Sequence, residues 1–408
     1  MTRLFANTLK SLCVVTLAAS MAGCEGETEQ KVYGNWYQTY SYFPGVPRGG
    51  AVCFQIEVGD TLCAFIGTGA NTNKTEEQER FRDFYMVSLN SEGKPSWTAR
   101  YEKLYSETDT AKAATTQKYY KENVPYNVAV ASMPREAAAR NGGVGFSING
   151  KGYVGLGYDG ENYLNDFWCY DPKTNSWEKA PTYPGDAVRY ATAFVIDNVA
   201  YVGCGEDYDN NILGDFYKFD GTTWTPVQSI GVPRTRATSF VCHVDGKAYG
   251  YVFGGSNGGA TQSFQRYDAE TNTWQTLRNA KDQSFDTFDD AYTTLARYGA
   301  SSFVMDDGTD DCRAYITMGT TLSSGSSLTT WEYNPKYDYW MPRGEFEGGF
   351  RIFSVTFTLH GDLDGRGERD VCYITTGASN DMTVTGSGGT FYNETWAYEP
   401  LAFREKRD

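Results

Sequence analysis

Arginine recurs at a fixed distance ahead of an aromatic residue. In this chain of 408 residues, five arginines lie six residues before a phenylalanine, and a sixth lies five residues before one. A guanidinium keeps its charge and binds a carboxylate or phosphate through paired hydrogen bonds. The spacing therefore predicts a ring of arginines that binds an anionic ligand, made by Arg48, Arg140, Arg189, Arg234, Arg297 and Arg351. Arginines that pack between repeated units and bind loops would recur in the same way, and the sequence leaves both interpretations open.

Three carboxylates on expected loops are candidates for proton transfer. They are Glu161, Glu206 and Asp207. A general acid or base needs a carboxylate whose pKa lies near the working pH. Solvated loop carboxylates are the commoner explanation, so we assign no catalytic residue from the sequence.

The segment 362–370 alternates acidic residues with glycine. Asp362, Asp364 and Asp370 carry carboxylates at a spacing that lets a short loop wrap oxygen ligands around Ca²⁺. The segment resembles the calcium loops of integrin-type propellers, although Arg366 stands where another acidic ligand is expected. A plain hairpin turn is the alternative. We expect no cofactor other than this possible calcium ion.

Composition excludes two classes of function. The chain has only two histidines, His243 and His360, so a catalytic site built on several histidines is excluded. It has 51 acidic and 36 basic residues, with a net charge of −15. Nucleic-acid phosphates require dense lysine and arginine patches, so we expect no nucleic-acid partner.

The N-terminus resembles a bacterial lipoprotein signal. Arg3 and Lys10 precede an apolar run that ends in Met21-Ala22-Gly23-Cys24. The run is too short to span a bilayer. We expect a signal peptide over 1–23, lipidation of Cys24, and a tether over 24–31. This predicts an outer-membrane lipoprotein, periplasmic or exposed at the cell surface, which is held to the membrane by its lipid alone.

Seven cysteines follow Cys24, and no two of them have the Cys-x-x-Cys spacing of zinc or redox sites. Cys53 and Cys63 flank one expected hairpin turn and could face each other as a disulfide. Buried thiols on strands are the alternative. The sequence leaves the pairing open.

Two strand patterns alternate along the chain. In the first, an aromatic residue precedes a glycine by four positions, at Phe65/Gly69, Tyr153/Gly157, Tyr201/Gly205, Tyr251/Gly255, Tyr315/Gly319 and Tyr373/Gly377. In the second, an acidic or polar residue precedes spaced aromatics, as in Asp166…Trp168…Tyr170, and a tryptophan closes the unit. Turn residues such as Asp268 to Asn272 separate the second pattern from that tryptophan.

The sixth unit lacks its closing tryptophan, whereas Trp36 has no strands before it. Both observations are explained if the N-terminal strand, with Trp36, completes the last unit. Such a closed ring leaves no exposed sheet edge.

These patterns resemble the kelch β-propeller family, most closely at Tyr251-Val252-Phe253-Gly254-Gly255 and Asn165–Asp171. The resemblance implies an all-β fold, a six-bladed propeller over 32–400 with a tail over 401–408. Only the fourth unit has the adjacent glycine pair of the family, while the first three have Gly-x-Gly.

The resemblance implies a binding or scaffolding module for a glycan or protein ligand, which the arginines predict to be anionic. We expect a monomer. Some bacterial kelch propellers are sialic acid mutarotases or epimerases, so a carbohydrate-active enzyme is the alternative. Galactose oxidase shares the architecture and binds copper through His and Tyr. Because His243 and His360 occupy equivalent positions two units apart, they cannot converge on one copper ion.

Overall fold

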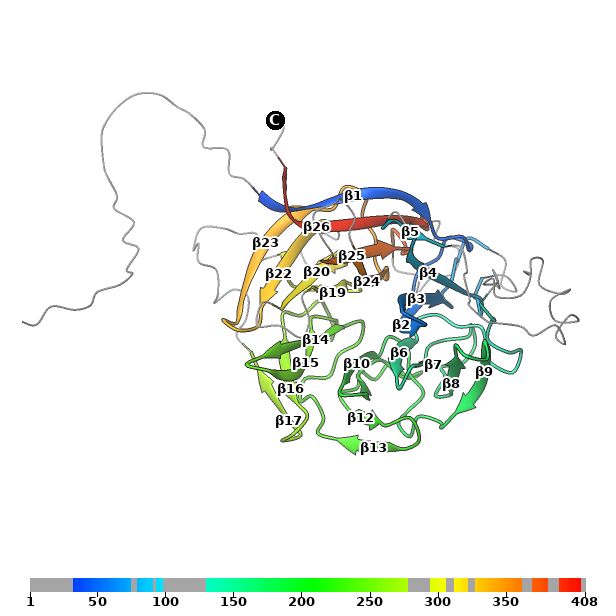
Figure 1. Cartoon of the computed structure of the whole chain (residues 1–408). Coiled ribbons are helices and arrows are strands. Elements are labelled where there is room, and N and C mark those ends of the chain that lie inside the picture. Colours follow the sequence, from blue (N-terminus) through cyan, green and yellow to red (C-terminus); the bar gives the residue numbers. More distant parts are fainter. Residues whose placement is uncertain are drawn as a thin grey trace, which may run out of the picture.

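The computed structural model describes residues 32–74, 79–90, 93–97, 130–277, 294–305, 312–321, 327–361, 369–380 and 389–404. All 26 elements of these residues are strands. They form six four-stranded sheets and one two-stranded sheet. The six sheets are arranged radially around a central axis as the blades of a propeller (Figure 1). The expectation of an all-β, six-bladed propeller is confirmed.

Each blade follows the chain from its innermost strand outward, and only the sixth departs from that order. Blade 1 contains β2 (Val52–Val58), β3 (Thr61–Gly67), β4 (Phe84–Leu89) and β5 (Pro95–Ser96). Blade 2 contains β6 (Val144–Ile148), β7 (Lys151–Gly155), β8 (Phe167–Asp171) and β9 (Ser176–Ala180). Blade 3 contains β10 (Thr192–Ile196), β11 (Val199–Gly203), β12 (Phe216–Phe219) and β13 (Trp224–Val227).

The second half of the chain repeats this plan. Blade 4 contains β14 (Thr238–Val244), β15 (Lys247–Phe253), β16 (Phe264–Asp268) and β17 (Thr273–Thr276). Blade 5 contains β19 (Ser301–Met305), β20 (Arg313–Thr317), β22 (Thr329–Asn334) and β23 (Tyr339–Glu345). Blade 6 contains β24 (Val355–Gly361), β25 (Arg369–Thr375), β26 (Glu394–Arg404) and β1 (Val32–Tyr42). The short strands β18 (Arg297–Tyr298) and β21 (Thr320–Thr321) pair with each other.

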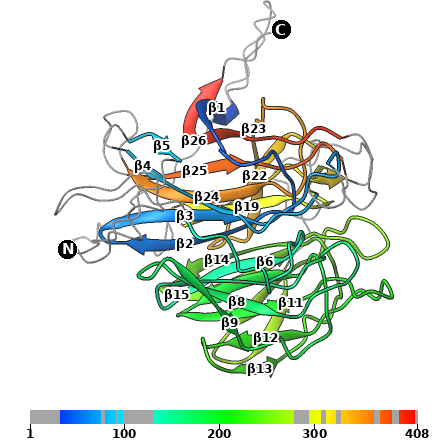
Figure 2. The same ribbon diagram turned by 90° about the vertical axis from the view of Figure 1, so that its right-hand side faces the viewer.

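The N-terminal strand closes the last blade. β1 pairs antiparallel with β26 and supplies the outer strand of blade 6, and both views show the two strands side by side (Figures 1 and 2). Trp36 lies opposite Tyr398, is 2% exposed, and donates its indole N–H to the Thr330 hydroxyl at 2.9 Å. The missing sixth tryptophan is therefore Trp36, as the sequence predicted.

One aromatic stack recurs in every blade. The phenylalanine of the innermost strand stacks on the aromatic residue of the second strand, with ring centroids 4.8–5.5 Å apart and interplanar angles of 8–20°. The pairs are Phe54/Phe65, Phe146/Tyr153, Phe194/Tyr201, Phe240/Tyr251, Phe303/Tyr315 and Phe357/Tyr373. Offset stacks of this kind add to the free energy gained by burying each ring. The repeated aromatics of the sequence are thus the core of each blade.

The Gly-x-Gly departure from the kelch pattern has a packing reason. At Gly155 an added Cβ would lie 2.4 Å from the ring of Phe167, which covers the glycine from the third strand. Gly157 has φ +96°, and a Cβ there would lie 2.7 Å from the Asn141 carbonyl oxygen. The first glycine therefore makes room for a ring, and the second allows a left-handed turn.

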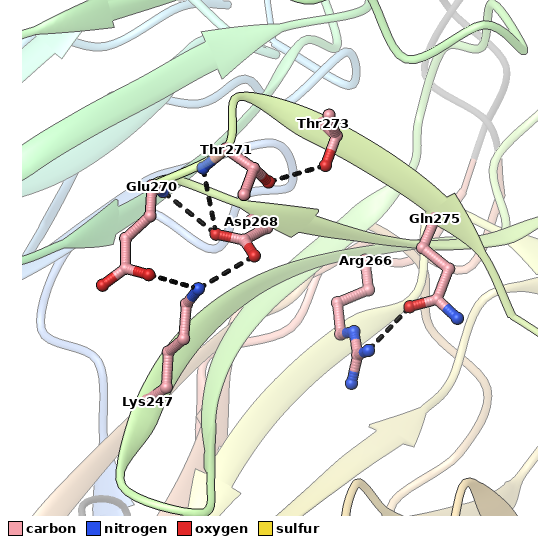
Figure 3. Close-up of polar contacts among 7 residues, drawn as sticks. All are labelled: Lys247, Arg266, Asp268, Glu270, Thr271, Thr273 and Gln275. Carbon is pink, nitrogen blue, oxygen red and sulfur yellow. Dashed lines mark hydrogen bonds and ion pairs between the residues drawn. The ribbon is translucent and has the colours of Figure 1, made fainter.

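The turn predicted at Asp268 to Asn272 links two blades. Asp268 accepts the backbone N–H groups of Glu270 and Thr271, and Lys247 bridges the Asp268 and Glu270 carboxylates at 2.9 and 2.6 Å (Figure 3). Asn272, at φ 52°, accepts the Gln228 backbone N–H of the preceding blade at 2.9 Å. The turn residues therefore stabilise both the hairpin and its contact with the neighbouring blade.

Two closed rings of backbone hydrogen bonds join the blades around the axis. In one, the N–H of each left-handed residue donates to the carbonyl of the equivalent residue in the preceding blade at 2.7–3.1 Å, through Gly50, Gly142, Tyr190, Arg236, Gly299 and Phe353. In the other, the glycine that follows each second strand donates to the next blade at 2.7–3.3 Å, through Gly69, Gly157, Gly205, Gly255, Gly319 and Gly377. These rings fix the loops of all six blades relative to one another.

Candidate functional site

Five of the six predicted arginines are buried inside their blades. The side chain of Arg140 is fully buried and pairs with both oxygens of Asp166, Nη1–Oδ1 at 2.6 Å and Nη2–Oδ2 at 2.9 Å. Its Nε donates to the Ala138 carbonyl at 3.1 Å, and Nη1 also donates to the Leu156 carbonyl at 3.3 Å. Every nitrogen of this guanidinium thus has a partner within blade 2.

The other four follow the same plan. Arg48 pairs with Asp83, and Arg351 lies 3.6 Å from Glu394. Arg234 donates to the Ser263 hydroxyl at 2.7 Å and to the Gln265 amide oxygen. Arg297 donates to the Met318 and Thr329 carbonyls at 2.9 and 3.0 Å. All five are 0–1% exposed.

The sequence predicted a ring of six arginines that binds an anionic ligand, but these five are buried. Their oxygen partners, which are carbonyls, carboxylates, a hydroxyl and an amide, use the hydrogen bonds that a ligand would need. The packing interpretation, which the sequence left open, describes their geometry.

Arg189 is not equivalent to the other five arginines. Gly157 donates to the Val188 carbonyl, as Gly69 does to the Arg140 carbonyl, so Val188 occupies the arginine position of blade 3. Arg189, one residue later, is 13% exposed and binds Glu206 through Nε at 2.7 Å. The five-residue spacing before Phe194 already marked this shift of one position.

Arg189 belongs to a cluster of arginines and tyrosines that we name the arginine–tyrosine surface. Its members are Arg80, Tyr158, Tyr163, Arg189, Tyr190, Glu206 and Arg236. The Arg80 guanidinium lies 4.8 Å from the Tyr158 ring centroid, and that of Arg189 lies 5.0 Å from Tyr163. The Arg236 guanidinium lies 4.6 Å from the Tyr190 ring. A cation above an aromatic face is stabilised by the ring quadrupole.

One carboxylate holds two of these arginines together. Glu206 accepts Arg189 at 2.7 Å and Arg236 at 2.8 Å, on different oxygens. Its two oxygens are therefore occupied by guanidinium donors, which does not suit the proton transfer considered for it. The Asp207 carboxylate binds the backbone and side-chain N–H groups of Asn211, so it stabilises its own turn. Glu161 is exposed, and its backbone N–H is bound by Asp159.

A cavity on the axis adjoins this surface. It has a volume of about 140 Å³ and is lined by residues of all six blades, including Tyr190, Arg236 and Phe353. Tyr190 and Phe353 stack on each other in its lining, with ring centroids 4.8 Å apart and an interplanar angle of 12°. Arg236 therefore faces both the cavity and the arginine–tyrosine surface.

The predicted calcium and lipid sites fall largely outside the described residues. Asp362, Asp364 and Cys24 lie there. Asp370 lies on β25, where its Oδ1 is 3.0 Å from Nδ1 of His360. In the part of the chain that the structure describes, no group of three potential ligand side chains could hold a metal ion. The described residues also contain no helix that is long and apolar enough to cross a membrane.

The cysteines of the described residues form no disulfide. Cys53 lies opposite Ile66, and Cys63 lies opposite Ile56, so the two do not face each other across their hairpin. The expectation of strand thiols is confirmed, with Cys63 buried and Cys53 partly buried. Burial raises the pKa of the Cys63 thiol to about 11, which keeps it protonated near neutral pH.

The geometry agrees with a comparison to known families. Residues 157–307 match the KLHDC2/KLHL20/DRC7 Kelch-repeats domain. This match and the six-bladed fold together support a kelch-repeat β-propeller. The match begins at the glycine that closes the second strand of blade 2 and ends after the first strand of blade 5. No curated protein matches the chain. A kelch propeller is suited to a protein-binding or scaffolding role.

Five members of the arginine–tyrosine surface were not predicted from the sequence, namely Arg80, Tyr158, Tyr163, Tyr190 and Arg236. One signal was present for Arg236. The left-handed position two residues after the buried arginine is glycine in three blades but Tyr190, Arg236 and Phe353 in the others. Large side chains at a position that favours glycine indicate a function other than the turn itself.

Proposed function

We propose that this kelch propeller is a lipid-anchored, extracytoplasmic binding module. Its arginine–tyrosine surface takes an anionic ligand, which we assign to an acidic segment of a partner protein. One observation carries the proposal. Three guanidiniums, 11–13% exposed, lie over tyrosine rings beside the axial cavity of a protein whose net charge is −15.

The local charge supports an anion. Arg80 binds Glu79 at 3.1 Å, and Arg189 and Arg236 share Glu206. Three guanidiniums and two carboxylates leave one net positive charge at this surface. An added carboxylate would accept from guanidiniums that are already held in place by rings and by Glu206, so little side-chain entropy is lost on binding.

The residue types support a protein partner. Tyrosine and arginine are enriched among the residues that dominate protein–protein binding energies, because each combines apolar area with directional donors. Kelch propellers are suited to such partners. A carboxylated glycan presents the same anionic group, and the test below separates the two ligands.

The anchor and location rest on the N-terminal sequence. Basic residues, an apolar run and Cys24 precede β1 (Val32–Tyr42), the outer strand of blade 6. A lipid on Cys24 would attach through 24–31 at the rim of the propeller. The protein should partition into detergent, and Cys24→Ala should move it to the aqueous phase. Partition of wild type into the aqueous phase would refute lipidation.

The ligand class can be tested by thermal shift. The panel contains a decaglutamate peptide, N-acetylneuraminic acid, and the neutral N-acetylglucosamine. We expect the peptide to raise the Tm, and Arg189→Ala to remove the shift while Arg266→Ala, which lies on β16, retains it. A shift with N-acetylneuraminic acid alone would reassign the ligand to a carboxylated glycan. Its anomer exchange by NMR would then test for mutarotase activity. No shift with either anion would refute the proposal.

A further inference from the structure

The five buried arginines occupy one recurring slot. Arg48 shows its parts in full. Its guanidinium donates to the carbonyls of Val46 at 2.8 Å and Thr68 at 3.0 Å, and pairs with the Asp83 carboxylate. It also lies 5.0 Å from the Phe43 ring and 3.9 Å from the Phe81 ring. Two carbonyls, a carboxylate and aromatic walls thus surround this guanidinium. Ser263 and Gln265 replace the carboxylate around Arg234, and the Thr329 carbonyl replaces it around Arg297.

Blade 3 has every part of this slot except the arginine. Val188, 1% exposed, stands at the arginine position. Counted along the repeat, Asp186 and Cys204 supply the carbonyls that correspond to Val46 and Thr68. Asp215 corresponds to Asp83, Tyr183 to Phe43, and Leu213 to Phe81. These five residues and Val188 line a cavity of about 170 Å³.

The cavity carries negative charge and opens to solvent. Asp186 and Asp215 are exposed, as is Pro184 at its rim. Asp215 accepts the Ser229 hydroxyl on Oδ1 at 2.8 Å. Burial raises the pKa of the Cys204 thiol to about 12, so this thiol adds no charge to the cavity near neutral pH.

We propose that the blade 3 cavity binds a guanidinium group supplied by a ligand. The ligand's guanidinium would donate to the Asp215 carboxylate and the Cys204 carbonyl, as Arg48 and Arg140 do to the equivalent groups of blades 1 and 2. Its alkyl chain would lie between Tyr183 and Leu213. Two sources present this group, a free alkylguanidine and an arginine side chain of a peptide. This site differs from the arginine–tyrosine surface in its residues and in the charge of its ligand.

The planar fork of a guanidinium distinguishes this site from a simple cation site. Two parallel hydrogen bonds to a carboxylate require that fork, whereas an ammonium ion is a point charge. We therefore expect n-propylguanidinium to bind at least about tenfold more tightly than n-propylammonium, both at millimolar, non-denaturing concentrations. Equal affinities would overturn the assignment to a guanidinium.

Val188→Arg is the decisive variant, because it places the protein's own guanidinium in the slot. We expect it to abolish n-propylguanidinium binding, followed by NMR titration, and to leave the Tm no lower than that of wild type. Asp215→Asn provides a second test that adds no bulk, and should weaken binding about tenfold. Wild-type affinity in either folded variant, or no binding to wild type, would overturn the proposal.

The two sources of the guanidinium are separated by their affinities. N-acetyl-arginine amide and the peptide Gly-Gly-Arg-Gly-Gly present the same group, so both should compete with n-propylguanidinium. Tighter binding of the peptide would assign the site to an arginine of a partner protein, and equal binding would assign it to a small alkylguanidine. Failure of both to compete would overturn the site.

Discussion

Arg140→Ala tests whether the buried arginines are structural. The substitution removes four hydrogen bonds and leaves three acceptors behind, which are the Ala138 and Leu156 carbonyls and the Asp166 carboxylate. Removal of one partner from a buried ion pair costs about 3–5 kcal/mol of unfolding free energy. Because the Asp166 side chain is 23% exposed and keeps the indole N–H of Trp168 at 2.7 Å, we expect the lower end, about 3 kcal/mol.

For a chain of this size, about 3 kcal/mol corresponds to a fall in Tm of about 4 °C. Differential scanning calorimetry of wild type and variant measures this directly. Arg189→Ala is the matched control. Its guanidinium is partly exposed, and Glu206 keeps Arg236, so we expect a loss of only about 1 kcal/mol. If the two variants have the same Tm, or if Arg140→Ala has the Tm of wild type, the buried arginine does not stabilise the blade.

Three further predictions concern closure, pH and the cysteines. Trp36→Ala should lower the unfolding free energy in urea by about 3–5 kcal/mol, because the ring is 2% exposed. Tyr40→Ala on the same strand should lower it by almost nothing, because Tyr40 is 79% exposed. Equal losses for the two variants would argue against closure by β1. Burial raises the pKa of Asp166, but the hydrogen bonds and charge of Arg140 outweigh this and hold it below its usual value. The Asp166–Arg140 pair therefore contributes its full unfolding free energy above about pH 4, and this contribution is lost as the pH falls through the lowered pKa of Asp166. Wild type should lose more stability than Arg140→Ala between about pH 5 and 2. Parallel curves of unfolding free energy against pH for the two proteins would contradict this prediction. Cys242 and Cys312 are both 0% exposed, with Sγ atoms 2.8 Å apart. Hydrogen peroxide, a small oxidant, should oxidise one thiol to a sulfenic acid that the other attacks with loss of water, which joins tryptic peptides 237–247 and 298–313 through a disulfide. Two alkylated peptides after oxidation would show that the thiols do not pair.

The fold could be predicted because its core residues repeat in sequence. Each stack of an inner phenylalanine on a second-strand aromatic leaves the same spacing in every unit, as at Phe146 and Tyr153. The exchange of the N-terminal strand was visible because one tryptophan was missing from the last unit and one stood unassigned at the start. Both signals are read from the positions of repeated residues along the sequence, without knowledge of the three-dimensional contacts.

The site could be predicted only in part, because its contacts join distant residues. Arg140 and Asp166 each belong to a repeated pattern, but their pairing across 26 positions depends on how the second strand of the blade turns back. The arginine–tyrosine surface brings Arg80 of blade 1 to Tyr158 of blade 2, and Arg236 of blade 4 to Glu206 of blade 3. No spacing in the sequence encodes these contacts, since the hydrogen-bonded rings between blades create them.

The central claim is that the arginine–tyrosine surface binds an acidic ligand, and calorimetric titration with the decaglutamate peptide tests it most directly. Wild type, Arg189→Ala/Arg236→Ala and Arg266→Ala are compared at one ionic strength. The Arg266 side chain binds Gln275 at 2.6 Å on blade 4, so its loss removes one positive charge away from the surface (Figure 3). We predict binding to wild type and to Arg266→Ala with equal Kd, and at least about tenfold weaker binding to the double variant. The same Kd for all three proteins would contradict the account.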